Sequence, residues 1–90
     1  MFYVYLLKSK KDGKLYTGST GNLVKRIERH NKGLVKATKY RRPLKLIYFE
    51  GCLSNKDTRK REMYLKSSWG KRYVKNRISN YLKESRLDKP

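Results

Sequence analysis

The sequence predicts a mixed α/β fold of the α+β kind, because strand-like and helix-like segments both occur along the chain. Three β-rich runs are typical of strands: 2–7, 15–18 and 44–50. Three segments with capping residues or helical periodicity are typical of helices: 22–30, 54–69 and 71–84. Ninety residues are enough for one domain with a modest core. We therefore expect one domain over residues 1–84 and a polar C-terminal tail at residues 85–90.

The first two strands are predicted to form a hairpin, because Asp12-Gly13 lies between them. A two-residue turn there would place Tyr5 opposite Thr20. That register puts three tyrosines on one face of the sheet: Tyr3, Tyr5 and Tyr16. A cross-strand aromatic pair explains two such tyrosines by itself. Gly18 on the same face would leave room for a ligand, although a glycine can also simply end a strand.

The first helix follows a polar turn, and Asn22 is its expected N-cap. Three apolar residues at helical spacing should face the core: Leu23, Val24 and Ile27. Arg26 and His30 are neighbours on the margin of that apolar side, where the wall of a pocket would lie. An ordinary amphipathic helix with a basic, solvated edge would show the same pattern.

The charge of the chain indicates a polyanionic partner. Twenty-five Lys and Arg against seven Asp and Glu give a formal net charge of +18, which destabilises a compact state unless an anion compensates it. Nucleic acid is the expected partner, and the many tyrosines add stacking surface. The loop at 31–42 is the expected landing surface for phosphates, with a flexible solvated loop as the alternative. The candidate nucleic-acid-binding residues are Gly18, Lys36, Lys39, Arg41 and Arg42.

Other classes of protein fit the sequence poorly. Cys52 is the single cysteine, so neither an internal disulfide nor a zinc site built on several cysteines is expected. The apolar run at 2–7 is too short for the core of a signal peptide or for a membrane span. No helical segment combines a broad apolar face with its lysines, as binding to a membrane surface would require. We expect a cytoplasmic protein with no membrane partner.

Glu62 is the least expected residue of the second helix. It falls on the stripe of Leu65 and Trp69, which is the least polar side of that helix. A carboxylate in such a place needs a partner, because burying an unpaired charge is costly. The partner could be a cation of the same helix, Lys66 or Arg59, or it could be a metal ion. The sequence leaves both interpretations open.

Two tripeptides of this chain resemble the strands that give the GIY-YIG nuclease superfamily its name. They are Tyr3-Val4-Tyr5 and Tyr16-Thr17-Gly18, which depart from the motif at Tyr3, Val4 and Thr17. Arg26 and Glu62 match the helix arginine and the metal-binding glutamate of the superfamily. The resemblance is greatest to its small stand-alone bacterial members.

This resemblance implies a three-stranded antiparallel sheet flanked by helices and a divalent-metal-dependent endonuclease that hydrolyses DNA phosphodiester bonds. The catalytic residues it implies are Tyr5, Tyr16, Arg26, His30 and Glu62. Glu62 would hold one Mg²⁺ or Mn²⁺ ion and Arg26 would bind the phosphate. Tyr5 would orient or deprotonate the attacking water, assisted by Tyr16 or His30.

The size of the chain bears on the substrate, because we expect one small domain without a separate recognition domain to read a long site. The expected nuclease is structure-selective or weakly sequence-specific and would serve DNA repair or recombination. The alternative is a non-catalytic basic protein that binds DNA, RNA or the ribosome through the same surface. The sequence does not decide the oligomeric state.

Overall fold

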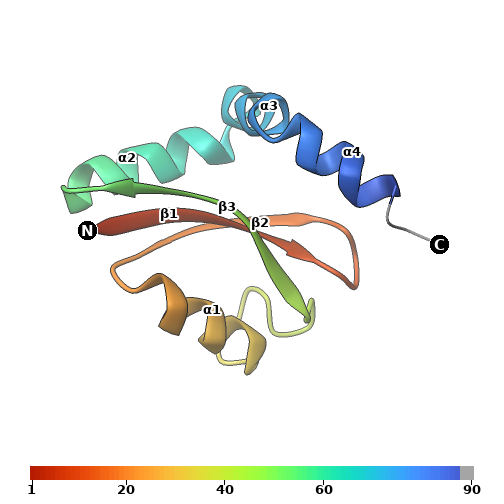
Figure 1. The fold of residues 1–90 in the computed structure, drawn as a ribbon. Helices are drawn as coiled ribbons and strands as arrows, with labels where there is room; N and C mark the ends of the chain where they lie inside the picture. The colour runs from red at the N-terminus through yellow and green to blue at the C-terminus, as the bar shows by residue number, and fades with distance from the viewer. Residues whose placement is uncertain (88–90) are drawn as a thin grey trace.

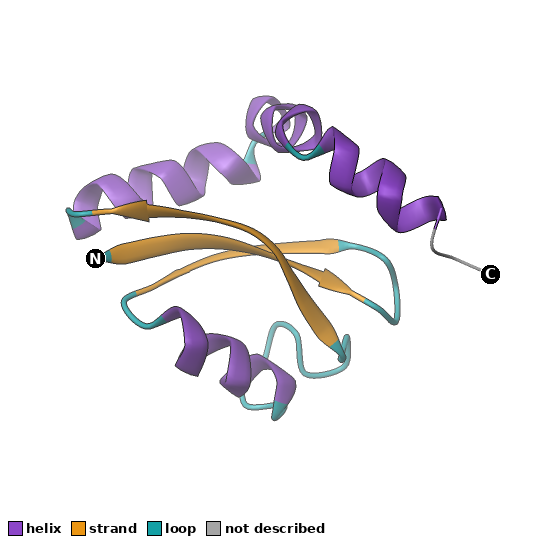
Figure 2. Cartoon of the chain, in the orientation of Figure 1, coloured by secondary structure: helices purple, strands orange, loops and turns teal. Residues whose placement is uncertain are grey.

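The computed structural model describes residues 1–87, and this part of the chain forms a three-stranded sheet and four helices (Figure 1). The elements in chain order are β1 (Phe2–Ser9), β2 (Leu15–Thr20), α1 (Leu23–Asn31), β3 (Leu44–Cys52), α2 (Asn55–Lys66), α3 (Ser68–Arg77) and α4 (Ser79–Leu87). The strands are antiparallel in the order β2-β1-β3, so β1 is central. Helix α1 covers one face of the sheet, and α2, α3 and α4 lie on the other side (Figure 2). The predicted fold is therefore confirmed.

The hairpin register differs from the predicted one by two residues. Tyr5 lies opposite Gly18, whereas a two-residue turn would have placed it opposite Thr20. The turn is longer because the Ser9 hydroxyl accepts hydrogen bonds from the amides of Lys11 and Asp12, so residues 10–14 all belong to it. A shift of two residues does not change which side chains share a face. The tyrosines of β1 and β2 therefore still share the face that the sequence predicts.

The sheet has a separate apolar cluster on each face. On the side of α2 and α3, Val4 and Leu6 pack with Leu65 and Val74. On the side of α1, the central residues are the fully buried Tyr5 and Leu7 and the nearly buried Leu44. These clusters fix the helices to the two faces of β1.

Helix α1 begins as predicted, with the Asn22 side chain accepting a hydrogen bond from the Lys25 amide. Leu23 and Ile27 pack against the cluster on this face. Val24, in contrast, is 69% exposed, and its predicted place in the core is wrong. Only two apolar residues of this short helix reach the sheet, so its third apolar residue remains in solvent.

The long second helix predicted at 54–69 is divided in two at Ser67. The Ser67 side chain accepts a hydrogen bond from the Gly70 amide and begins α3. Gly70 therefore does not end a helix: it lies inside α3, where a Cβ atom would overlap the backbone of Tyr64 and Leu65. The break also turns Trp69 out of the predicted stripe, and its side chain is 70% exposed.

The C-terminal part of the chain is more helical than predicted. A second break at Ile78 separates α3 from α4, which continues to Leu87 and so includes three residues of the expected tail. Residues 88–90 of that tail lie outside the described part of the chain.

Helix α2 is held across the sheet by an ion pair. Arg61 donates two hydrogen bonds to the Glu50 carboxylate of β3, at 2.8 and 3.0 Å. The rings of Tyr64 and Tyr73 lie within about 5 Å of the Arg61 guanidinium carbon, at 5.1 and 4.8 Å. Bidentate arginine–carboxylate pairs fix orientation as well as distance. This pair therefore sets the rotation of α2 and the direction of the next residue, Glu62.

Candidate active site

A buried chain of polar side chains joins β1, α1 and the loop that follows α1. The Tyr5 hydroxyl lies 2.8 Å from His30 Nε2, and His30 Nδ1 lies 2.7 Å from the Thr38 hydroxyl. All three side chains are fully buried. Both ring nitrogens of His30 are therefore engaged, and neither is free to meet a substrate.

Arg26 and Tyr16 lie at the rim of this chain, where both are half-buried. The Arg26 Nε–H donates a hydrogen bond of 3.4 Å to the Tyr5 hydroxyl. The Tyr16 ring packs edge-on against His30 with centroids 5.1 Å apart, and it lies 6.4 Å from the Tyr5 ring. The structure thus brings together four of the predicted site residues.

Gly18 makes this arrangement possible. A Cβ atom at this position would lie 2.5 Å from the Tyr5 hydroxyl oxygen and 3.1 Å from the Tyr16 ring. The Tyr5 phenol therefore fills the space beside Gly18 that was predicted to admit a ligand. Gly18 serves to position Tyr5, and its predicted contact with nucleic acid stays a prediction.

The surroundings set the protonation states of the cluster. Burial, with the charge of Arg26, lowers the pKa of His30 to about 4, so the imidazole is neutral at physiological pH. Burial also raises the pKa of Tyr5 above its usual value, although the Arg26 hydrogen bond opposes this, so Tyr5 carries its proton. The Tyr5 hydrogen bond raises the pKa of Arg26. The cluster therefore consists of one cation, the Arg26 guanidinium, next to the neutral side chains of Tyr5 and His30.

Glu62 approaches the same edge strand from the other face of the sheet. Its Oε1 accepts a hydrogen bond of 2.6 Å from the Ser19 hydroxyl, and its Oε2 lies 2.9 Å from Lys66 Nζ. Ser19 follows Gly18 in β2, and neighbouring residues of a strand point to opposite faces. Glu62 is therefore separated by the edge strand from the cluster around Tyr5, although its charge contributes to the raised pKa of Tyr5, after the larger effect of burial.

The donor set at Glu62 fits a single-carboxylate metal site. Burial disfavours the Glu62 charge, but the Ser19 hydrogen bond and Lys66 outweigh it, so the pKa is lowered and the carboxylate is ionised. Mg²⁺ is commonly held by one or two carboxylates together with water and substrate phosphates. In the described part of the chain no three His, Cys, Asp or Glu side chains group together as metal ligands. The ligands of a metal ion here would therefore be Glu62, water and the substrate phosphate, and the ion would have to displace the half-exposed Lys66 ammonium.

The basic loop is anchored to the fold. Val35 and Thr38 are buried, and the Asn31 side chain makes two hydrogen bonds with the backbone of Leu44. Arg41 is half-buried and pairs with Asp12 of the hairpin turn at 2.9 Å. The hydrogen bond from the Lys14 amide and, after it, the one from Arg41 lower the pKa of Asp12 to about 2. The other predicted phosphate contacts are exposed: Lys36, Lys39 and Arg42.

Sequence reasoning missed two residues of this site, Thr38 and Ser19. Thr38 lies in a loop rich in lysine, and no periodicity marks it as buried. Ser19 was interpreted as a turn residue because β2 was expected to end at Gly18, whereas the strand continues to Thr20. If the predicted strand had been extended by two residues, the alternation of its side chains would have placed Ser19 on the same face of the sheet as Val4.

Comparison with known protein families identifies the class to which this fold and the cluster of Tyr5, Tyr16, Arg26 and His30 belong. A family model described as the GIY-YIG catalytic domain matches residues 1–77, and the chain belongs to this family. This match confirms the resemblance to the nuclease superfamily that the tyrosine motifs indicate.

Within this family the chain is similar to the UPF0213 proteins of bacteria. It is 42% identical over 90 residues to the UPF0213 protein of Clostridium perfringens, covering 99% of this chain and 96% of the relative. The UPF0213 protein of Pediococcus pentosaceus is 48% identical over 66 residues, covering 72% and 68%. The solution NMR structure of the UPF0213 protein from Bacillus halodurans has a TM-score of 0.51 at 33% identity and covers 82% of each chain.

None of the helices among residues 1–87 has both the length and the apolar character needed to traverse a bilayer.

We predict that His30 makes stability depend on pH. The unfolded chain takes up a proton near pH 6.5, whereas folded His30 stays neutral down to about pH 4. Stability should therefore fall as pH decreases from 6.5 to 4, by at most about 1.4 kcal/mol per pH unit. NMR titration of this residue, the chain's one histidine, and urea unfolding at each pH would measure both effects.

The variant His30→Gln is the control, because it keeps a polar side chain but cannot titrate. It should remove most of the pH dependence above pH 5. A wild-type His30 that titrates near 6.5 would contradict the buried, neutral assignment.

Proposed function

We propose that the protein is a divalent-metal-dependent endonuclease that hydrolyses DNA phosphodiester bonds, with selectivity for structure over sequence and a role in DNA repair or recombination. The observation that carries the proposal is the position of Arg26, whose Nε is held by the buried Tyr5. The Arg26 side chain makes this hydrogen bond through Nε, and its two terminal amino groups are the donors that would bind phosphate oxygens. A guanidinium held in this way stabilises the charge that develops on a phosphate in the transition state.

The tyrosines have different roles in this proposal. Tyr5 is fully buried, so it is a positioning residue: its hydroxyl oxygen accepts the Arg26 hydrogen bond, and the same hydroxyl is hydrogen-bonded to His30 Nε2. His30 in turn is fixed by Thr38. Tyr16 is half-buried at the rim, whereas Tyr5 is fully buried, so the Tyr16 hydroxyl is the phenol that we expect a water molecule or a phosphate to reach. We assign the orientation of the attacking water to Tyr16.

Glu62 would be the protein ligand of one Mg²⁺ or Mn²⁺ ion. When bound there, the ion would supply Lewis-acid polarisation of the scissile phosphate and stabilise the leaving oxygen. Ser19 orients the carboxylate by donating to Oε1, which leaves Oε2 to exchange Lys66 for a cation. The substrate would lie along the free edge of β2, where groups from both faces of the sheet can approach it.

A non-catalytic nucleic-acid-binding protein is the second candidate, and one observation favours it. Glu62 already pairs with Lys66, one helical turn away. This is the cation of the same helix that the sequence offered as the alternative to a metal ion. A carboxylate satisfied by Ser19 and Lys66 needs no metal ion. DNA, RNA and ribosomal RNA would be equivalent partners for such a protein.

We predict that Tyr5→Phe and Tyr16→Phe differ in their effect on stability. Tyr5→Phe leaves the buried Nε2 of His30 without its hydrogen-bond partner and should cost about 1–3 kcal/mol in the free energy of unfolding, with loss of cleavage. Tyr16→Phe should reduce cleavage while stability changes by less than about 0.5 kcal/mol. Urea unfolding and plasmid nicking measure both. Full cleavage by Tyr16→Phe would overturn its assignment.

We predict that Glu62→Gln abolishes metal-dependent nicking, by about 100-fold or more, because the anchoring charge is lost. Its stability and DNA affinity should change little, since glutamine keeps the Ser19 hydrogen bond and the pair with Lys66 is largely solvated. The matched control is Glu84→Gln on exposed α4, which removes the same charge. Equal cleavage by all three proteins would reject Glu62 as a ligand. No cleavage of DNA or RNA by any of them, with Mg²⁺ or Mn²⁺, would favour the non-catalytic protein.

We predict that the exposed cations of the loop set part of the salt dependence of DNA binding. Affinity should fall by roughly tenfold or more between about 50 and 200 mM salt if several phosphates are neutralised. Replacing Lys36, Lys39 and Arg42 with alanine should flatten that slope. Arg41 is left unchanged because it pairs with Asp12 and its loss would disturb the loop itself. An unchanged slope would exclude the loop from the binding surface.

A further inference from the structure

A second basic surface lies on the sheet face opposite α1. Three cavities of about 330, 240 and 420 Å³ lie between the hairpin turn and the helices α3 and α4. All three are lined by Gly13, and adjacent cavities share Lys8, Leu15 or Lys75, so they form one groove. We call it the lysine groove, after the residues that line it: Lys8, Lys10, Lys14, Lys45, Lys71 and Lys75.

The charge of this groove is not compensated within the described part of the chain. Lys8 and Lys45 are direct cross-strand partners in β1 and β3. Like charges at such positions destabilise a sheet. The ion pairs among the described side chains of residues 1–85 all lie elsewhere: they are Arg41–Asp12, Arg61–Glu50 and Lys66–Glu62. No acidic residue in this same range lines the groove. Two lysines that lie directly opposite each other with no acidic partner indicate a site that binds an anion.

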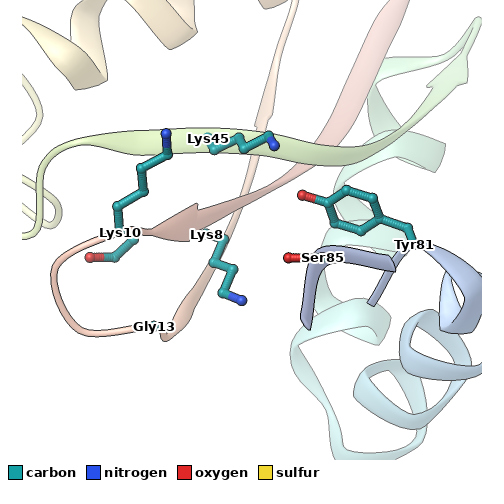
Figure 3. Close-up of a pocket in the computed structure, with 7 residues that line it drawn as sticks. Lys8, Lys10, Gly13, Lys45, Tyr81 and Ser85 are labelled. Atoms are coloured by element: carbon teal, nitrogen blue, oxygen red, sulfur yellow. The ribbon is translucent and has the colours of Figure 1, made fainter. Parts of the chain in front are cut away.

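The floor of the groove combines apolar and hydroxyl groups. Leu15, Val74 and Leu82 line its middle part. At one end, Lys8 and Lys45 extend from two strands toward Tyr81 and Ser85 of α4 (Figure 3). Lys45 Nζ lies 5.5 Å from the centre of the Tyr81 ring, and the two hydroxyl groups can donate to a phosphate oxygen.

We propose that the lysine groove is a second nucleic-acid-binding site that contacts the phosphodiester backbone. The described side chains of its rim are lysines and include no arginine, which suits point-charge contact with a row of phosphates better than planar recognition of individual carboxylates. The groove and the cluster around Arg26 lie on opposite faces of the sheet, so one molecule can contact two segments of nucleic acid. This inference concerns binding alone and stands apart from cleavage.

NMR with ¹⁵N-labelled protein and a short DNA duplex in EDTA tests the site without any hydrolysis. We expect the amides of Ser9, Gly13, Lys45 and Ser85 to shift, in addition to those near Arg26. The double variant Lys8→Gln/Lys45→Gln should lose the groove shifts and lower the slope of affinity against salt by about 1–2. The matched control is Lys56→Gln/Lys60→Gln, which removes the same charge from the exposed face of α2 and should leave the slope nearly unchanged.

Stability provides a second readout, because removing one of two opposed lysines relieves their repulsion. Lys8→Gln alone should raise the thermal midpoint while it weakens binding, which a variant with a damaged fold would not do. Groove amides that do not shift with DNA, or that shift only with a peptide rich in Asp and Glu, would overturn the proposal. Shifts in the groove without cleavage in any metal would support this site and reject the proposed enzyme.

Discussion

The hydrogen bond between the Tyr5 hydroxyl and His30 Nε2 joins the central strand to the first helix, and the candidate active site depends on it. Both groups are buried, so removing either one would leave the other without a hydrogen bond and would lower the free energy of unfolding by about 1–3 kcal/mol. The hydrogen bond holds the phenol across Gly18, and the phenol holds Arg26. The imidazole is also bound by Thr38, which ties the basic loop to the same centre. The geometry of a guanidinium at the surface is thus set by an interior network.

The sequence was sufficient to predict which side chains meet on the face of α1, because that depends on parity and not on exact register. Tyr5 and Tyr16 share a face whether Tyr5 lies opposite Gly18 or Thr20. The register itself could not be predicted. Asp12-Gly13 is a strong signal for a short turn, but the Ser9 hydroxyl competes for the turn amides and extends it. The N-cap at Asn22 could be predicted because capping is local.

Contacts between distant segments were beyond sequence reasoning. The family resemblance implies that Glu62 acts together with Tyr5 and Tyr16, yet α2 packs on the other face of the sheet and directs Glu62 to Ser19. That direction follows from the ion pair of Arg61 with Glu50, which lies eleven positions away in β3 and obeys no helical period. Gly70 likewise falls between the two helices that the sequence predicts at 54–69 and 71–84, whereas in the structure it lies inside α3 and allows the backbone of α2 to pack closely. Such roles are defined by packing between elements, which a pattern within one element does not record.

The few acidic residues of this chain are used to fix geometry. Asp12 holds Arg41 at the hairpin turn, Glu50 orients α2 and Glu62 meets the edge strand. With seven acids and a net charge of +18, most cations then face only solvent. Their repulsion lowers the stability of the folded state, and a bound polyanion relieves it. A ligand that binds only the folded state stabilises it further by mass action. Binding of nucleic acid at the two proposed surfaces would therefore be coupled to the stability of this domain through charge on both faces of the sheet.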